Sequence, residues 1–248
     1  MWKQCVADLF CYKFDFGVPL DDLFPPNDLH PKIELMYSYA SKSLKKEMFG
    51  SDIVSSSSNQ TEDLINLRKM VLNSKYLQGT PQSFLWLIEH FLGLLPIPLL
   101  PPYLQEKRLN WLLLSKQCKG IFQRYHETKR INYNLDDEIV SEMSKLPPQH
   151  SLLLDLQIRF MREISFFPEK LSRKKSKLIY YTKYFTASIF LRPFRSGLEQ
   201  SIEKEYRYII LYMVLRWPFI QITYIHPSLS ISELEQSTIR YKSKRIFK

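Results

Sequence analysis

The sequence predicts an all-α protein, a single bundle of about eight to nine helices. Only six of the 248 residues are glycine, while 45% are hydrophobic and 14% are aromatic. The apolar residues mostly recur at the i, i+3, i+4 spacing that places them on one face of a helix. A chain of this length and composition buries a sizeable core and lacks the low hydrophobicity of a disordered protein.

The stretch from Thr80 to Leu100 is expected to form the central helix. Thr80 is a suitable N-cap, and Pro81 suits the first helical position. The helix should end before Pro96 and Pro98, because neither ring can donate a helical hydrogen bond. Apolar side chains between these signals cover most of the helix surface, which predicts burial among other helices: Phe84, Leu85, Trp86, Leu87, Ile88, Phe91, Leu92 and Leu95.

The other helices are predicted from the same spacing and from start and stop signals. In chain order they are expected at 31–47, 61–71, 103–125, 137–146, 153–164, 176–191 and 198–216. The serine-rich stretch 51–60 and the basic stretch 169–175 are expected to be loops.

Three regions are expected along the chain. Residues 1–15 form an N-terminal extension, 16–216 the helical domain, and 217–248 a basic C-terminal tail. The apolar stretch from Tyr208 to Ile225 is interpreted as a buried helix followed by an extended strand. Arg216 and Pro218 lie near its middle, which argues against a membrane span.

The formal charge of +10 favours an acidic partner, which could be a protein face, an anionic membrane or nucleic acid. Each basic cluster is also compatible with an ordinary solvated helix face. No nucleic-acid partner is expected, since the sequence shows neither a recognition helix nor an aromatic ladder. The basic clusters are Lys42, Lys45 and Lys46; Arg173, Lys174, Lys175 and Lys177; and Arg240, Lys242, Lys244, Arg245 and Lys248.

The cysteines and histidines predict neither disulfides nor a metal site. Cys5, Cys11 and Cys118 are odd in number and lack CxxC spacing, which is typical of reduced thiols in an intracellular protein. The five histidines are scattered without metal-ligand spacing. His90, on the central helix, is interpreted as a surface or boundary residue. The location expected is cytoplasmic, with peripheral membrane attachment as a possibility left open.

No motif predicts an enzyme with its own substrate pocket. The sequence contains no G-x-G-x-x-G, no P-loop and no G-x-S-x-G, and no cofactor is expected. Asp136, Asp137 and Glu138 are adjacent carboxylates, but at a helix start they are better explained by the helix macrodipole than by acid–base catalysis.

Four segments resemble, in the correct order, motifs of RhoGAP domains, the GTPase-activating modules of Rho-family small GTPases. Phe16–Leu20 resembles the opening motif, and Phe84–Leu100 is similar to the central "LLK-x-x-LRELPEPLL" helix and turn. Leu146–Leu153 resembles the "LP-x-x-N/H…LL" step, and Phe185–Pro193 the helix ending in "LLRP". The resemblance is greatest to the RhoGAP-like domain of the Lowe-syndrome type inositol polyphosphate 5-phosphatases.

The resemblance also implies a GTPase-facing surface that has lost its catalytic residue. RhoGAP domains carry an arginine finger in the loop after the first core helix, worth about 10³–10⁵ in hydrolysis rate. In this chain Gly50 stands in place of the finger, Glu89 in place of a GTPase-contacting lysine, and Gly93 in place of an arginine. The asparagine expected between Ser172 and Lys177 is missing. No catalytic residue is therefore predicted, and the binding surface is expected at Lys46, Phe49, Gly50, Glu89, Gly93 and Arg192.

Three hypotheses follow from this pattern. The first is a protein that binds a Rho, Rac or Cdc42-type GTPase or an adaptor peptide without accelerating hydrolysis. The second is an active GTPase activator that uses a displaced cation, Arg68 or Lys46. The third is a helical scaffold held to membranes by its basic loop and tail.

Overall fold

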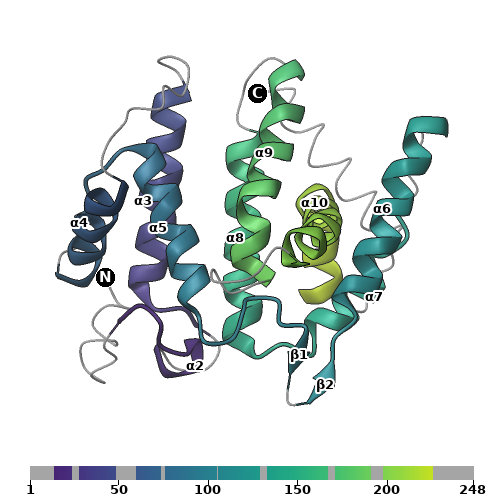
Figure 1. Cartoon of the computed structure of the whole chain (residues 1–248), viewed down its shortest axis with the longest axis horizontal. Helices are drawn as coiled ribbons and strands as arrows, with labels where there is room; N and C mark the ends of the chain where they lie inside the picture. Colours follow the sequence, from purple (N-terminus) through teal and green to yellow (C-terminus); the bar gives the residue numbers. More distant parts are fainter. Residues whose placement is uncertain are drawn as a thin grey trace.

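The structure is a computed structural model that describes residues 14–23, 28–48, 60–73, 76–104, 106–128, 133–166, 171–190 and 198–225 (Figure 1). Within these residues it is all-α apart from one two-stranded hairpin, which confirms the predicted class of a bundle of about eight helices. The elements are α2 (Leu20–Leu23), α3 (Pro31–Met48), α4 (Gln60–Asn73), α5 (Pro81–Leu94), β1 (Tyr103–Leu104), β2 (Lys107–Arg108), α6 (Trp111–Thr128), α7 (Asp136–Met143), α8 (Pro148–Phe166), α9 (Leu171–Phe190) and α10 (Leu198–Ile225).

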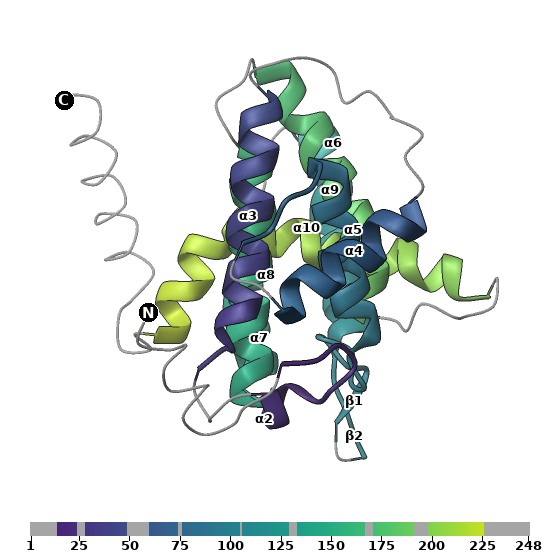
Figure 2. The same ribbon diagram turned by 90° about the vertical axis from the view of Figure 1, so that its left-hand side faces the viewer.

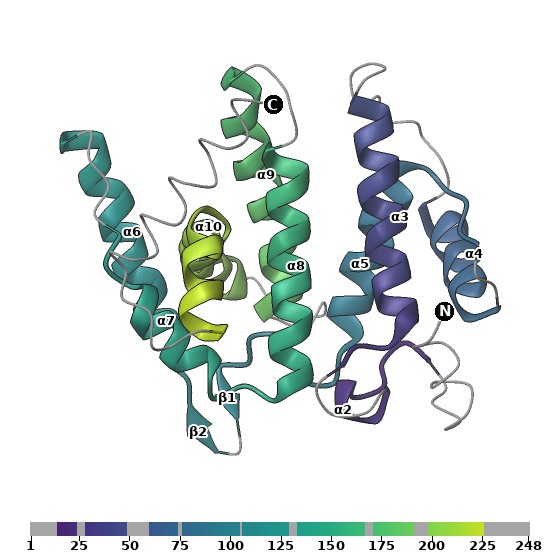
Figure 3. The ribbon, with the colours of Figure 1, turned by 180° about the vertical axis from the view of Figure 1, so that it is seen from behind.

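Four helices form a closed core. α3 packs against α5 and α8, and α9 packs against the same two helices. α4 covers the outer side of α5, while α10 lies between the α8–α9 pair and the α6–α7 pair (Figures 1 and 3). α5 therefore shares surface with α3, α4 and α9, as expected of the central helix.

The capping signals at the start of α5 act as predicted. The Thr80 side-chain oxygen accepts a hydrogen bond from the Ser83 backbone N–H at 3.1 Å, and Pro81 is the first helical residue. The helix ends at Leu94, two residues before Pro96. Most of the apolar side chains predicted to be buried are buried, with Phe91 fully inaccessible. Trp86 is only partly buried, contrary to the prediction, because it lies on the side of the helix away from the apolar face.

The helix predicted from Tyr103 begins eight residues later than expected. Tyr103 pairs with Arg108 in a short antiparallel hairpin, whose turn includes Glu106 with a positive φ of 67°. α6 then begins after Asn110, whose backbone carbonyl accepts the Leu114 N–H at 2.9 Å. The Asn110 side chain donates to Glu142 at 3.0 Å, which fixes this corner against α7.

The basic loop predicted at 169–175 is helical from Leu171 onwards. α9 begins five residues before the predicted start at Ser176, so the sequence Arg173–Lys177 lies in its first two turns. Lysine and arginine are good helix formers, and the hydrophobic spacing used for the prediction does not register them.

The prediction that the last helix ends at Arg216 is also wrong. α10 continues through Pro218 to Ile225, with no break into an extended strand. Proline cannot donate to the carbonyl four residues earlier, which here belongs to Val214. Arg162 of α8 donates to that carbonyl at 2.7 Å and to the Leu215 carbonyl at 3.1 Å. A side chain from another helix thus satisfies the acceptor that Pro218 leaves unpaired.

Described residues outside the predicted range 16–216 also pack into the bundle. Trp217 and Ile220 are buried, and the Trp217 indole N–H donates to Asp155 of α8 at 2.9 Å. Residues 217–225 therefore belong to the bundle and not to a tail. At the other end Phe14 is buried, with its ring 5.9 Å from that of Phe91, so this residue before position 16 also contributes to the core.

Asp136 has a larger role than the predicted interaction with the macrodipole of α7. It is 4% exposed and forms an ion pair with Arg216 of α10, to which the guanidinium Nε donates at 3.1 Å. The Tyr212 hydroxyl donates to the same carboxylate at 2.8 Å and accepts the Leu135 N–H at 3.0 Å. This network connects the start of α7 to the middle of α10.

Candidate functional site

The structure describes only part of the predicted binding surface. Glu89 and Gly93 lie on α5, one helical turn apart. Lys46 belongs to the last turn of α3. Phe49, Gly50 and Arg192 lie outside the described residues, as do residues 51–59 of the serine-rich stretch and the C-terminal basic cluster at 240–248.

Glu89 is half-buried in the seam between α5 and α9. Its neighbour across the seam is Tyr184, whose buried hydroxyl lies beside the Glu89 carboxyl but makes no hydrogen bond of ordinary geometry with the described residues. The Tyr180 ring stacks on that of Tyr184 with centroids 6.0 Å apart and is 46% exposed. At this contact between α5 and α9 the chain has a carboxyl and two tyrosines, at the place where the resemblance implies a GTPase-contacting lysine.

Burial governs the protonation of this pair. It raises the pKa of Glu89, a shift that the neighbouring Tyr184 hydroxyl partly offsets. Burial also raises the pKa of Tyr184, and the Glu89 carboxylate raises it further. The phenol therefore keeps its proton at all physiological pH values, and Glu89 is the group of this pair that titrates first.

Replacing Glu89 with glutamine is expected to stabilise the protein at neutral pH. A raised carboxyl pKa means that the folded state disfavours the charge relative to the unfolded state, whose pKa is near the ordinary value of 4.5. The stabilisation should be complete above the folded-state pKa and should vanish below about pH 4. Urea denaturation of the two proteins at pH 7 and at pH 4 measures it. A glutamine variant that is less stable at pH 7 would show that the carboxylate is held by a favourable interaction.

Gly93 is buried and lies near the end of α5. Twelve residues separate it from Pro81, about 18 Å along the helix axis. α3 and α5 run in opposite directions, so the last turn of α3 lies at the end of the bundle where α5 begins (Figures 1 and 3). Lys46 and Gly93 are therefore placed towards opposite ends of the core, and the structure does not bring these two residues to one point.

Arg68, one of the two candidate displaced cations, is held by the N-terminal segment. Its guanidinium lies 4.9 Å from the centre of the Phe16 ring and 3.5 Å from the Asp15 carboxylate. It also lies near His90, whose pKa is lowered by burial and by the positive charge of Arg68. The half-buried position of His90 agrees with its interpretation as a boundary residue.

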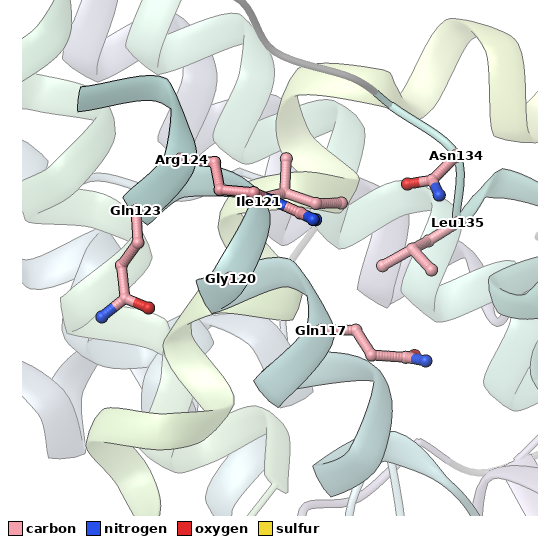
Figure 4. A pocket seen from close by; sticks show the side chains of 7 residues that line it. All are labelled: Gln117, Gly120, Ile121, Gln123, Arg124, Asn134 and Leu135. Atoms are coloured by element: carbon pink, nitrogen blue, oxygen red, sulfur yellow. The ribbon is translucent and has the colours of Figure 1, made fainter. Parts of the chain in front are cut away.

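A separate cavity of about 470 Å³ lies beside α6 and was not predicted from the sequence (Figure 4). Gln117, Ile121 and Arg124 extend towards it from α6. They face Asn134 and Leu135, the two residues that precede α7, while the Gln123 side chain points in another direction. Gly120 also lines the cavity, and a Cβ built at this residue would meet no atom within 4 Å. Its polar groups, amides and one guanidinium, can bind a ligand but supply no acid–base pair or nucleophile.

Two further properties concern the described part of the chain. Within it, no group of three histidine, cysteine or acidic side chains is placed to hold a metal ion. None of its helices combines the length and apolarity needed to cross a membrane.

Comparison with known protein families finds no match for this chain, and comparison with curated proteins finds no similar sequence.

Proposed function

We propose that this chain is a RhoGAP-like binding protein that docks a Rho-family GTPase or an adaptor peptide without accelerating GTP hydrolysis. The observation that supports it best is that the four resembling segments meet in space. Three of them contain or lead into α5, α8 and α9, which together with α3 form the core, and the first, which ends in α2, contacts α5.

Specific contacts join these segments. Leu100, at the end of the central motif, donates its N–H to the carbonyl of Ile189 in the α9 motif at 2.9 Å. His150, from the step into α8, lies with its Nδ1 3.4 Å from the Leu99 carbonyl. Such contacts between distant motifs are expected of a shared fold and are not required by helical patterning alone.

The opening motif contacts the same helix. The Phe16 ring is edge-on to Phe91 of α5, with centroids 5.9 Å apart. Gly17 has a positive φ of 82°, and a Cβ added there would lie 3.6 Å from the Leu94 carbonyl oxygen. All four segments therefore converge on α5 or on the turn that follows it.

The absence of catalysis follows from residue chemistry. An arginine finger acts by placing a cation against charge that develops only in the transition state. Gly50 has no side chain to donate, and Glu89 offers a carboxyl where the family has an ammonium. Binding through the remaining surface does not require either cation.

Docking and catalysis can be tested separately. We expect the wild-type chain to be retained by at least one nucleotide-locked Rho-family GTPase and to leave its single-turnover hydrolysis rate unchanged. Replacing Gly50 with arginine should raise that rate at least about tenfold, since a finger is worth about 10³–10⁵ when fully positioned. Gly120→Arg, which adds the same side chain at an open site on α6, serves as the matched control and should have no effect.

Two outcomes would contradict the proposal. If the wild-type chain bound no GTPase and no adaptor peptide, the proposed binding function would be wrong. Acceleration by the wild-type chain, lost in Arg68→Ala or Lys46→Ala, would establish the alternative of an active GTPase activator with a displaced cation.

A further inference from the structure

The fold brings two of the basic clusters to one end of the four-helix core. Lys42, Lys45 and Lys46 lie in the last two turns of α3, and Arg173–Lys177 lies in the first two turns of α9. α3 ends and α9 begins at the same end of the core, shown at the top of Figures 1 and 2. In the sequence these clusters are more than 120 residues apart, and nothing there indicates that they meet.

The charge of the core is strongly asymmetric along its length. At this end, the terminal eight residues of the four core helices contain nine cationic and two acidic residues, a net charge of +7. At the opposite end, the corresponding residues contain two cationic and three acidic residues, a net charge of −1. We name the positive end the basic end; its ranges are 41–48, 81–88, 159–166 and 171–178.

Glu163, one of the two acidic residues of the basic end, is held by local partners. Glu163 of α8 accepts a hydrogen bond from the Ser41 hydroxyl at 2.8 Å and pairs with Lys45. Burial opposes the charge of Glu163, but these partners dominate and lower its pKa. The carboxylate is therefore ionised at neutral pH and already counted in the net charge of +7.

The composition of the basic end favours a diffuse anionic surface over a single phosphate. Six of its nine cations are lysines. A lysine ammonium is a point charge, whereas bidentate recognition of one phosphate or carboxylate uses the planar guanidinium of arginine. The two arginines on α8 have internal partners: Arg162 donates to the α10 carbonyls, and Arg159 pairs with Asp155 at 2.7 Å. The lysines come from α3 and α9, which both pack on α5 and α8 but not substantially on each other within the described residues, so the basic positions are spread across the end of the core.

We propose that the basic end binds the surface of anionic lipid membranes. Four to eight basic residues held at a membrane surface contribute about 1 kcal/mol each, so a net charge of +7 is sufficient for reversible attachment. This attachment uses neither Gly50 nor Glu89 and shares only Lys46 with the predicted GTPase-binding surface. The lysines changed in its test, Lys174 and Lys175, lie outside that surface, so its failure can be told apart from a failure of GTPase docking. It differs from attachment by a loop and tail, because the basic residues belong to two helices of the core, α3 and α9.

Vesicle cosedimentation with the full chain tests this inference. We expect binding to vesicles that contain phosphatidylserine, weak or no binding to pure phosphatidylcholine, and loss of binding as the salt concentration rises. The double variant K174E/K175E should bind at least about 30-fold more weakly, because loss of each lysine alone corresponds to roughly fivefold and each added carboxylate is repelled by the anionic lipid. The matched control K107E/R108E makes the same charge change on the exposed hairpin at the opposite end (Figure 2) and should retain most of the binding.

The competing explanations give different results. Equal weakening by the two double variants would assign binding to net charge and would overturn the proposal. Loss of binding in R240Q/K242Q/K244Q/R245Q with retention in K174E/K175E would assign it to the C-terminal residues instead. Binding to soluble polyglutamate but not to vesicles would identify an acidic protein as the partner. Circular dichroism of each variant confirms that the comparison is made between folded proteins.

Discussion

Replacing Asp136 with alanine is expected to lower the free energy of unfolding by about 3–5 kcal/mol. The substitution leaves the Arg216 guanidinium, whose side chain is 12% exposed, without its carboxylate, and removes an acceptor of the Tyr212 hydroxyl. An unpaired charge in such surroundings costs far more than the loss of a surface ion pair. Urea denaturation at pH 7, followed by circular dichroism, measures the difference.

The adjacent residue provides the control for this prediction. Asp137 is exposed at the same helix start, and Asp137→Ala should change stability by no more than about 1 kcal/mol, the usual size of a macrodipole interaction. The double variant D136L/R216M should recover much of the lost stability, because it removes both charges together. Equal effects of Asp136→Ala and Asp137→Ala would show that the ion pair contributes nothing beyond the macrodipole.

Replacing Trp217 with alanine is expected to destabilise the protein by about 3–5 kcal/mol. The side chain is 2% exposed and fills the interface between α8 and α10, where its N–H bonds Asp155. Trp217→Phe should cost less, since it retains most of the apolar volume and loses chiefly the hydrogen bond. Thermal or urea unfolding of the full chain distinguishes the three proteins.

The matched control for this prediction is Tyr224, another aromatic residue of α10. It is 38% exposed, and Tyr224→Ala should cost well under half of the Trp217→Ala effect. If Trp217→Ala left stability unchanged, the segment after Arg216 would be dispensable, and the boundary expected from Arg216 and Pro218 would be restored.

The parts of the fold predicted correctly are those determined by neighbouring residues. Thr80 and Pro81 mark the start of α5 through local geometry, and the helical spacing of Phe84 to Leu95 identifies its buried face. Most of the core side chains follow from this periodicity. Hydrophobic spacing predicts which face of a helix is buried, and this prediction does not depend on which other helix covers that face.

The errors arose where a distant residue decides the local structure. Pro218 stops a helix unless its missing hydrogen bond is compensated, and the compensating Arg162 lies more than 50 residues earlier. Asp136 is indistinguishable from Asp137 in sequence, although its partner Arg216 is 80 residues away. Neither the Arg162–Pro218 compensation nor the Asp136–Arg216 ion pair can be predicted from the roughly 11–18 neighbouring residues in which hydrophobic periodicity is judged.

In the predicted site, too, local features were predicted and features that depend on distant residues were not. Glu89 was correctly placed on α5 by its position in the helix, but the half-buried setting beside Tyr184 depends on how α9 packs. The charge of the basic end likewise depends on helix direction, which composition does not encode. The cavity beside α6 combines residues from two elements and has no motif at all.

The position of α10 has a consequence for synthesis of the chain. α6 packs mainly on α10, which is the last described helix to leave the ribosome. The apolar face of α6 therefore stays uncovered while some 70 further residues are translated. During that interval a nascent chain exposes the surface that α10 will later bury, which makes α6 the natural contact for a chaperone that acts during translation.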